Sequence, residues 1–262
     1  MPDTPSVLYL AINLPRAAER RESLTRQAER LGIRIDMVPA VAGTELPEDT
    51  TTCGYDKITR RKAFSNDLLP NEIACALSHR KALRTFLDSG ADYAVVLEDD
   101  ALLSENFNEG LHELFHHLSG WQVAKLFTAD GRLFPLLPQK TGGCIEPVFP
   151  KKLPWVAVGY LYSRAAAQTV YEKLGRFWLP ADAQIGRILL DEVIPTIGVS
   201  PSLVVSADPN NEQSTLDADG ARRAERPKRS LLQYIRYRAS VLHTAFAKRR
   251  MRKKMSKLLS HR

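Results

Sequence analysis

The sequence has few cysteines and no long hydrophobic run. Cys53, Cys75 and Cys144 lie far apart in a chain of 262 residues. They therefore form neither a CxxC pair nor the even set typical of a disulfide framework, which favours a reducing compartment. The apolar stretch that begins at Val7 is short, is interrupted by Asn13 and has no basic segment before it. We expect no signal peptide, no membrane-spanning helix and a cytoplasmic protein.

The chain also lacks the two glycine-rich motifs that bind phosphate groups, GxGxxG and GxxxxGK[ST]. The first marks dinucleotide sites and the second triphosphate sites. The N-terminal residues nevertheless predict a βαβ unit, with a strand at 7–12, a helix at 16–31 and a strand at 33–38. The chain thus begins like a nucleotide-binding sheet in which neither of those two sites is indicated.

The charge of the chain is unevenly distributed. With 44% hydrophobic residues the protein can bury a sizeable core. Residues 221–262 hold fifteen Lys and Arg against one acidic residue, Glu225, and so carry +14. Because the whole chain carries +7, residues 1–220 carry −7. The sequence therefore indicates a mildly acidic body followed by a strongly basic tail.

Three consecutive carboxylates follow the most apolar short stretch of the chain. Residues 94–97 are Ala-Val-Val-Leu, and Glu98, Asp99 and Asp100 come directly after them. The apolar run predicts a buried strand, and ligands of open α/β sheets bind beyond the carboxyl ends of strands. Adjacent carboxylates repel one another, so a divalent cation with a bound diphosphate is the natural partner. The alternative is a solvated acidic turn.

The remaining patterns predict an alternation of helices and strands. Residues 44–70 are polar and indicate a loop, and residues 135–154 are rich in Pro and Gly and suit a loop that covers an acceptor. The other predicted elements are a helix at 71–87, strands at 123–127 and 155–162, a helix at 164–174, a helix from 180–182 to about 190 and a last strand at 197–205.

Six short motifs stand in a fixed order between residues 7 and about 205. They are AINL at 11–14 with Arg16 and Arg20 after it, PAVAG at 39–43, EIACALSH at 72–79, VLEDDA at 96–101, GYLYS at 159–163 and PAD at 180–182. In this order the chain resembles glycosyltransferase family 25, the bacterial lipooligosaccharide galactosyltransferases and their collagen-modifying relatives. The resemblance implies an α/β fold of the GT-A type, a Rossmann-like, mixed and mostly parallel sheet flanked by helices. The expected domains are a catalytic domain at 1–215 and the basic helical tail at 221–262.

The resemblance also implies a donor site at the acidic stretch. The donor would be a UDP-sugar, with galactose as the expected sugar, and the cofactor a divalent metal, with Mn²⁺ expected. Asp99 and Asp100 would face the metal, and the sequence leaves open which of them ligates it directly. The other donor residues would be Glu98 toward the ribose or sugar ring, and Asn13, Arg16 and Arg20 toward uridine and phosphate.

Two of these donor residues have a plainer interpretation. Arginine suits phosphate because its fork of N–H groups fits two oxygens. Arg16 and Arg20 could equally lie on the solvated face of the first helix. Likewise, His79 inside the helix at 71–87 could be a structural histidine that a neighbouring carbonyl satisfies.

Asp182 is the candidate catalytic base. It precedes a helix and follows a loop, a place that suits a carboxylate facing the acceptor, although a simple helix cap is the alternative. By resemblance, transfer to a lipooligosaccharide or lipopolysaccharide glycan inverts the anomeric centre in one displacement, while a carboxylate base takes the proton of the acceptor hydroxyl. The alternative from another class is a catalytically silent glycan-binding protein with the same fold.

One further motif indicates a different chemistry. His112, Glu113 and His116 match HExxH, the zinc-protease arrangement on a helix. The extended form of that motif would have Gly at 119 and His at 122, where this chain has Ser119 and Gln122. Without a third ligand, the match is better explained as chance on an amphipathic helix.

The basic tail predicts a peripheral membrane contact. Residues 230–247 have apolar residues at helical spacing, broken by Arg238, and residues 248–254 are almost entirely Lys and Arg. Basic amphipathic helices lie well on anionic membranes, whereas basic clusters can also bind nucleic acid. We favour the membrane because the stripe is apolar and the expected acceptor is a lipid-linked oligosaccharide. The expected location is the inner face of the cytoplasmic membrane, with no nucleic-acid partner.

Overall fold

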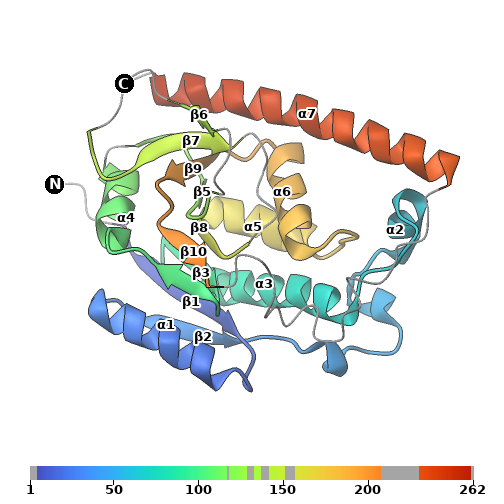
Figure 1. Ribbon diagram of the computed structural model, residues 1–262, viewed down its shortest axis with the longest axis horizontal. Coiled ribbons are helices and arrows are strands. Elements are labelled where there is room, and N and C mark those ends of the chain that lie inside the picture. The colour runs from blue at the N-terminus through green and yellow to red at the C-terminus, as the bar shows by residue number, and fades with distance from the viewer. Residues whose placement is uncertain are drawn as a thin grey trace.

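The computed structural model of the chain describes residues 5–116, 118–128, 133–136, 142–150, 157–207 and 230–260. Figure 1 shows a sheet between layers of helices, with a long helix along one side. The strands are β1 (Val7–Asn13), β2 (Ile35–Pro39), β3 (Tyr93–Glu98), β4 (Ala101–Leu103), β5 (Val123–Lys125), β6 (Leu133–Pro135), β7 (Glu146–Pro150), β8 (Gly159–Ser163), β9 (Thr196–Ser200) and β10 (Val204–Ser206). The helices are α1 (Ala18–Arg30), α2 (Lys57–Ala63), α3 (Pro70–Asp88), α4 (Phe107–His116), α5 (Arg164–Lys173), α6 (Ala181–Asp191) and α7 (Leu231–Ser260), with 3-10 turns η1 (Gly43–Glu45) and η2 (Thr50–Cys53).

The central sheet has eight strands in the order β2-β1-β3-β8-β5-β9-β7-β6. The pairs β1–β2, β1–β3 and β5–β9 are parallel, and the other neighbours are antiparallel. A separate antiparallel pair joins β4 to β10. This mixed sheet with flanking helices confirms the predicted fold class and is consistent with a GT-A-like fold. The predicted βαβ unit is confirmed as β1-α1-β2.

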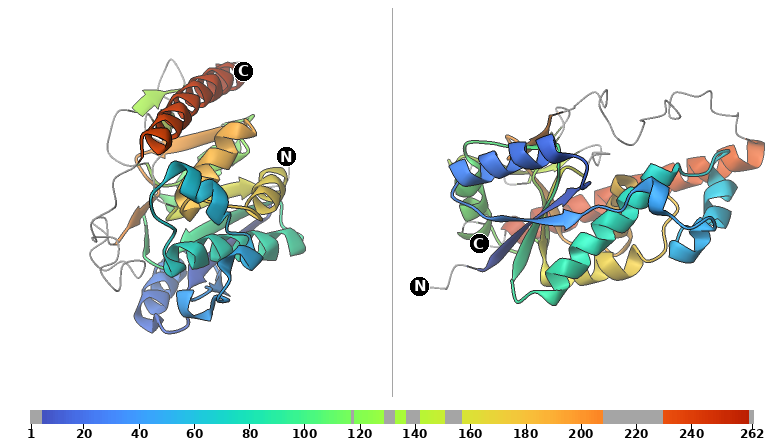
Figure 2. Two further views of the ribbon diagram at one scale, coloured as in Figure 1. Left: turned by 90° about the vertical axis from the view of Figure 1, so that its right-hand side faces the viewer. Right: turned by 90° about the horizontal axis from the view of Figure 1, so that it is seen from below.

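Both faces of the sheet are covered, which explains the unbroken apolar run of β3. Val96 packs in a cluster with residues of α3, α5 and α6, whereas Val95 and Leu97 pack in a cluster with residues of α1, α4 and α7. Successive residues of a strand point to opposite faces, so a strand buried on both sides has no polar alternation. The two further views in Figure 2 show the helical layers on either side of the sheet.

Three predicted segments differ from the structure. The expected loop at 44–70 contains α2, which Asp56 caps by accepting a hydrogen bond from the Thr59 N–H at 2.9 Å. The expected loop at 135–154 includes strand β7, which pairs with both β9 and β6. The last strand predicted at 197–205 is two strands, β9 and β10, separated around Pro201, because proline has no N–H with which to continue a ladder. Residues 155 and 156 of the strand predicted at 155–162 lie outside the described residues.

The described part of the tail, residues 230–260, forms one helix rather than a helix followed by a separate basic run. Helix α7 continues through the basic residues 248–254, and Figure 1 shows it running from α2 past α6 toward β6. Its C-terminal half belongs to the core, because Met251, Met255 and Leu259 are buried in the cluster with α1 and α4. The predicted boundary between body and tail, at 215–221, lies outside the described residues and stays a prediction. Among the described helices, none is both long and apolar enough to cross a membrane.

Candidate functional site

The predicted donor residues meet where β1 and β3 end. The two strands are parallel neighbours, and Ile12 lies opposite Glu98 in their register. Parallel strands that end together bring the residues just beyond them to one edge of the sheet. Asn13 is the last residue of β1 and Asp99 directly follows β3, and the Asn13 amide Nδ2 donates to Asp99 Oδ2 at 2.9 Å.

Arg20 reaches the same carboxylate from α1. Its Nη1 lies 3.1 Å from Asp99 Oδ1, and the Asp99 side chain is only 13% exposed. Both oxygens of Asp99 therefore have a partner, one cationic and one neutral. Arg16 is exposed before the start of α1 and, within the described chain, forms no ion pair with these carboxylates. The structure thus brings Asn13, Arg20 and Asp99 together and leaves Arg16 at the rim.

Asp100 differs from Asp99 in its hydrogen bonding. Burial, and secondly the charge of Glu98, raise the pKa of its carboxyl above the ordinary value. The Ser206 hydroxyl donates to Oδ2 at 2.5 Å, but Oδ1 is buried without a hydrogen-bond partner among the described residues. A buried, unbonded carboxylate oxygen requires an explanation, and a divalent cation would supply one.

The donor set at this edge fits a cation that substrate also ligates. Among the described residues, the groups of three potential Cys, His, Asp or Glu ligands do not include Asp99 or Asp100. Mg²⁺-like ions are commonly held by one or two carboxylates together with substrate phosphates. Asp100 fits such a ligand better than Asp99, because both oxygens of Asp99 are already engaged.

Glu98 turns to the face of the sheet that α3 covers. Its Oε1 lies 3.1 Å from the Nε2 of His79, whose side chain is 3% exposed. His79 thus pairs with a carboxylate, in place of the carbonyl that we expected for a structural histidine. His79 positions Glu98, and Glu98 remains 30% exposed toward the strand end.

A buried lysine links the donor residues to Asp182. Lys125 is the last residue of β5, is 2% exposed, and lies opposite Tyr160 of β8 with its Nζ 4.7 Å from the ring centroid. Burial lowers the pKa of Lys125 to about 7, against the smaller opposing effects of Asp182 and then Glu98. Asp182 lies in the first turn of α6, where Oδ1 accepts the Ala183 N–H at 2.7 Å. Lys125 therefore interacts electrostatically with both Asp182 and Glu98.

Sequence reasoning missed Lys125. In a sequence pattern, a lysine at the end of an apolar strand indicates the point at which the strand leaves the core. Its buried neighbours come from β8 and α6, much later in the chain. The hydroxyl of Tyr160 is also buried and has no hydrogen-bond partner in the described part of the chain.

The depressed pKa predicts a pH-dependent contribution of Lys125 to stability. Between pH 7 and about 10.5 the unfolded chain holds this proton and the folded chain releases it, so the contribution rises with pH, by at most about 1.4 kcal/mol per pH unit. We expect thermal melts of wild type and Lys125→Met at pH 7 and 9.5 to show the difference in Tm moving in favour of wild type as pH rises. Lys253→Met, on the exposed face of α7, is the control. A constant difference for Lys125→Met would show that the lysine keeps an ordinary pKa.

Comparison with known families adds the decisive observation. Residues 8–134 match the model of glycosyltransferase family 25, described as an LPS biosynthesis protein. This part of the chain is similar to glycosyltransferase family 25. The match contains the meeting point of β1 and β3 as well as Lys125, whereas Asp182 and α7 lie beyond it. No curated protein sequence matches the chain.

The family match indicates a glycosyltransferase of lipopolysaccharide biosynthesis, and the HExxH motif has a structural role instead. Glu113 is buried on α4 and its carboxylate accepts the backbone N–H groups of Cys144 and Ile145, at 2.5 and 3.3 Å. A glutamate committed to two loop amides is not a general base for metal-bound water. Glu113 therefore holds the segment before β7 against α4.

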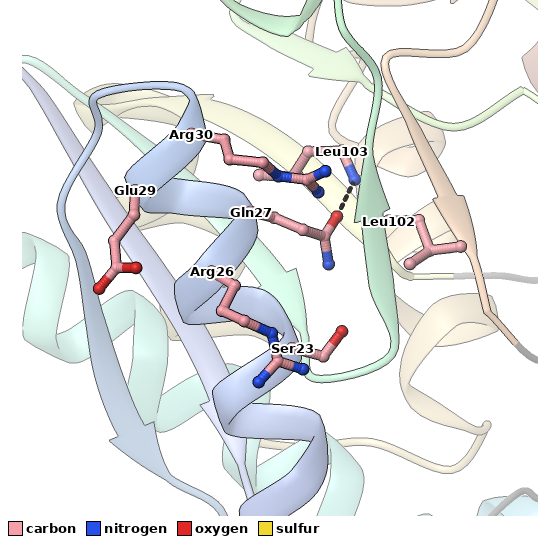
Figure 3. Close-up of a pocket in the computed structure, with 7 residues that line it drawn as sticks. All are labelled: Ser23, Arg26, Gln27, Glu29, Arg30, Leu102 and Leu103. Carbon is pink, nitrogen blue, oxygen red and sulfur yellow. Dashed lines mark hydrogen bonds between the residues drawn. The ribbon is translucent and has the colours of Figure 1, made fainter.

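A shallow groove lies beside the site, between α1 and β4. Figure 3 shows Gln27 at its centre, where the Gln27 Oε1 accepts the Leu103 N–H at 2.8 Å, and Arg26 and Arg30 along its wall. The buried Gln27 thus fixes β4, the strand that directly follows the acidic residues. The groove has about 750 Å³ of space, but Asp99 and Asp100 do not line it, and we give it no part in the chemistry.

Proposed function

We propose that this protein is a metal-dependent glycosyltransferase that moves a sugar, with galactose expected, from a UDP-sugar to a lipooligosaccharide or lipopolysaccharide glycan with inversion. The buried, unbonded Oδ1 of Asp100 carries the proposal. It lies at the carboxyl end of β3, beside a carboxylate that already has an arginine. A cationic, phosphate-bearing ligand would satisfy that oxygen, and the family match over residues 8–134 supports a sugar nucleotide as its source.

The donor is held by residues of β1, α1 and β3. Arg20 lies next to Asp99, so a diphosphate that binds here can share its guanidinium, and the exposed Arg16 is free to swing toward the phosphates. Asn13 and Glu98 are assigned to the uridine, ribose or sugar side. A divalent cation at Asp100, with Mn²⁺ expected, would neutralise the charge that develops on the leaving diphosphate.

The acceptor is activated by Asp182. Its carboxylate takes the proton of the acceptor hydroxyl while the hydroxyl oxygen attacks the anomeric carbon and the bond to the UDP oxygen breaks. Attack from the side opposite the leaving group inverts the centre. The nearby Lys125 supports this assignment, because its protonated form, which prevails below about pH 7, interacts favourably with the carboxylate of Asp182.

A UDP-sugar hydrolysis assay separates this function from that of a silent glycan-binding protein. Many transferases release UDP slowly when water replaces the acceptor, whereas a binding protein would not. We expect UDP release from at least one UDP-sugar that requires Mn²⁺ and stops with chelator. Binding of glycan without any UDP release, with or without acceptor, would favour the silent protein.

The proposed membrane contact rests on the orientation of α7, whose apolar side faces away from the body of the protein over the first half of the helix. In its N-terminal half, α7 turns polar residues toward the body of the protein. Gln233 donates to two backbone oxygens at the end of α2, Ser240 accepts a hydrogen bond from Arg187 at 3.1 Å, and His243 lies 3.7 Å from Asp191. The large apolar residues of the same half are exposed, namely Leu231, Leu232, Tyr234, Ile235, Val241, Leu242 and Phe246.

An exposed apolar stripe with basic neighbours suits an anionic lipid surface. Phe246 is 71% exposed and Leu242 58%, and such a patch on a soluble surface marks an interaction site. Arg238, Arg249 and Arg250 are exposed on the same helix. Each basic residue near an anionic leaflet contributes about 1 kcal/mol, and Arg238 can extend its charged end to the headgroups from within the stripe. The proposed site of action is accordingly the inner face of the cytoplasmic membrane.

Substitution of this stripe should release the protein from membranes. Deleting the tail is a poor test, because it would also remove Met251, Met255 and Leu259 from the core. We expect wild type to sediment with vesicles that contain anionic lipid, less so at high salt. Leu242→Glu combined with Phe246→Glu should stay in the supernatant yet retain UDP-sugar hydrolysis. Ile58→Glu changes an equally exposed apolar residue on α2 and is the control. Equal sedimentation of all three proteins, or binding of duplex DNA in place of vesicles, would overturn the membrane proposal.

A further inference from the structure

A group of three potential metal ligands lies next to the proposed donor site, on the side of the sheet that α3 covers. Cys75 and His79 are one helical turn apart on α3, and Glu98 ends the neighbouring strand β3. The sulfur, one imidazole nitrogen and one carboxylate oxygen all lie within 4.8 Å of one another. We propose that these three residues form a binding site for a thiophilic divalent cation, with Zn²⁺ as the best fit, distinct from the Asp100 position.

The ligand types and their spacing favour zinc. Thiolate, imidazole and carboxylate are its usual ligands, at about 2.0–2.3 Å from the metal, so ligand atoms of one tetrahedral site stand roughly 3–4 Å apart. His79 Nε2 and Glu98 Oε1 are 3.1 Å apart, already within that range. Mn²⁺ and Mg²⁺ prefer oxygen ligands, so Cys75 and His79 would select against the cation expected at Asp100.

The burial of the three residues leaves one position open. His79 is almost fully buried and Cys75 half-buried, both on the packed side of α3, so their backbones are fixed by the core. Glu98 is 30% exposed, so a fourth ligand, a water molecule, can enter from the strand end. Three protein ligands and one water make an open zinc site.

Metal binding requires two proton movements. The Cys75 thiol loses its proton to solvent and becomes the thiolate ligand. A metal bound at His79 Nε2 requires that this nitrogen carry no proton. The neutral imidazole ring then carries its one proton on Nδ1. Binding therefore weakens as pH falls, because protons compete for sulfur and nitrogen.

Occupancy would act on the transferase through Glu98. This consequence rests on the proposed function, in which Glu98 faces the ribose or sugar ring. A carboxylate drawn toward zinc on the α3 side is no longer available to the donor. We expect zinc to raise the KM for the UDP-sugar at fixed Mn²⁺, with less effect on kcat.

Cobalt titration tests the site without any assay of activity. Co²⁺ replaces Zn²⁺ in such sites, and a thiolate ligand gives it an intense charge-transfer absorption in the near ultraviolet. We expect this absorption in the wild-type chain, its displacement by Zn²⁺, and its loss in Cys75→Ser. Cys53→Ser and Cys144→Ser are matched controls and should keep it.

The same titration distinguishes this site from another possible metal site. A second group of possible ligands, Glu109, Glu113 and Cys144, exists in the described chain. Absorption that disappears in Cys144→Ser and persists in Cys75→Ser would place the metal there and overturn the proposal, as would absence of any thiolate–cobalt absorption. Glu98→Gln keeps the volume and a hydrogen-bonding group and should weaken cobalt binding about tenfold or more. This second variant tests the site independently if Cys75→Ser fails to fold. A positive cobalt result stands even if no UDP-sugar is hydrolysed.

Discussion

Replacement of Asp100 by asparagine should remove nearly all sugar transfer and leave the fold intact. The amide oxygen can still accept the Ser206 hydroxyl, so local packing survives. The negative charge at the end of β3 is lost, and with it the ligand for the expected cation. Because burial raises the pKa of Asp100, ionisation of this carboxyl lowers the stability of the folded protein, so the variant should be no less stable than wild type.

The measurement is UDP release and transfer with Mn²⁺, together with metal-dependent UDP binding and a thermal melt. Asp36→Asn is the control and should remain active, because Asp36 lies on β2, which is separated from β3 by β1, and pairs only with Arg34 among the described residues. Asp99→Asn should also lose activity, since it frees Arg20 from its partner. Near-normal turnover with manganese in both Asp100→Asn and Asp99→Asn would refute the donor site.

Asp182→Asn should lower kcat by about 10²-fold or more while the affinity for UDP-sugar barely changes. This is the usual effect of losing a general base. The substituted amide can still accept the Ala183 N–H that Asp182 accepts in the first turn of α6, so the helix start is preserved. Asp191→Asn, at the other end of α6, is the matched control.

Two other outcomes are informative. Weaker donor binding with unchanged chemistry would reassign Asp182 to the donor site. Unchanged kcat and KM would leave it as a helix-start residue, the plainer interpretation of its position. Solvent hydrolysis of the UDP-sugar should fall less than transfer, because water does not depend on the same placement as an acceptor hydroxyl.

The arrangement of the donor residues could be predicted because it follows from local patterns. Asn13 and Glu98 end two apolar runs that the sequence identifies as strands, and these strands, β1 and β3, are parallel neighbours. The sequence assigns Asn13, Arg20 and Asp99 to one site, and the structure brings them together with contacts at 2.9 and 3.1 Å. The family match over residues 8–134 covers the same part of the chain.

Other features depend on tertiary pairing and could not be read from local patterns. Lys125 is buried because β5 lies inside the sheet, between β8 and β9, with Tyr160 of β8 against the lysine. The side of α7 that faces the body is set by polar contacts with α2 and α6, which a hydrophobic pattern does not reveal. The pairing of His79 with Glu98 needs both α3 and the end of β3, and the two residues lie 19 residues apart in the chain.

The central claim is that the strand end holding Asp100 binds a sugar nucleotide with a divalent cation. A thermal-shift panel of UDP-sugars, each with and without Mn²⁺, tests it most directly. A ligand at a hundred times its Kd stabilises a protein by about 2.7 kcal/mol, which for a chain of this size raises Tm by several degrees. We predict such a rise for UDP-galactose or a related UDP-sugar only when Mn²⁺ is present, and none in Asp100→Asn. Stabilisation by no UDP-sugar, or an equal rise in Asp100→Asn, would contradict the account.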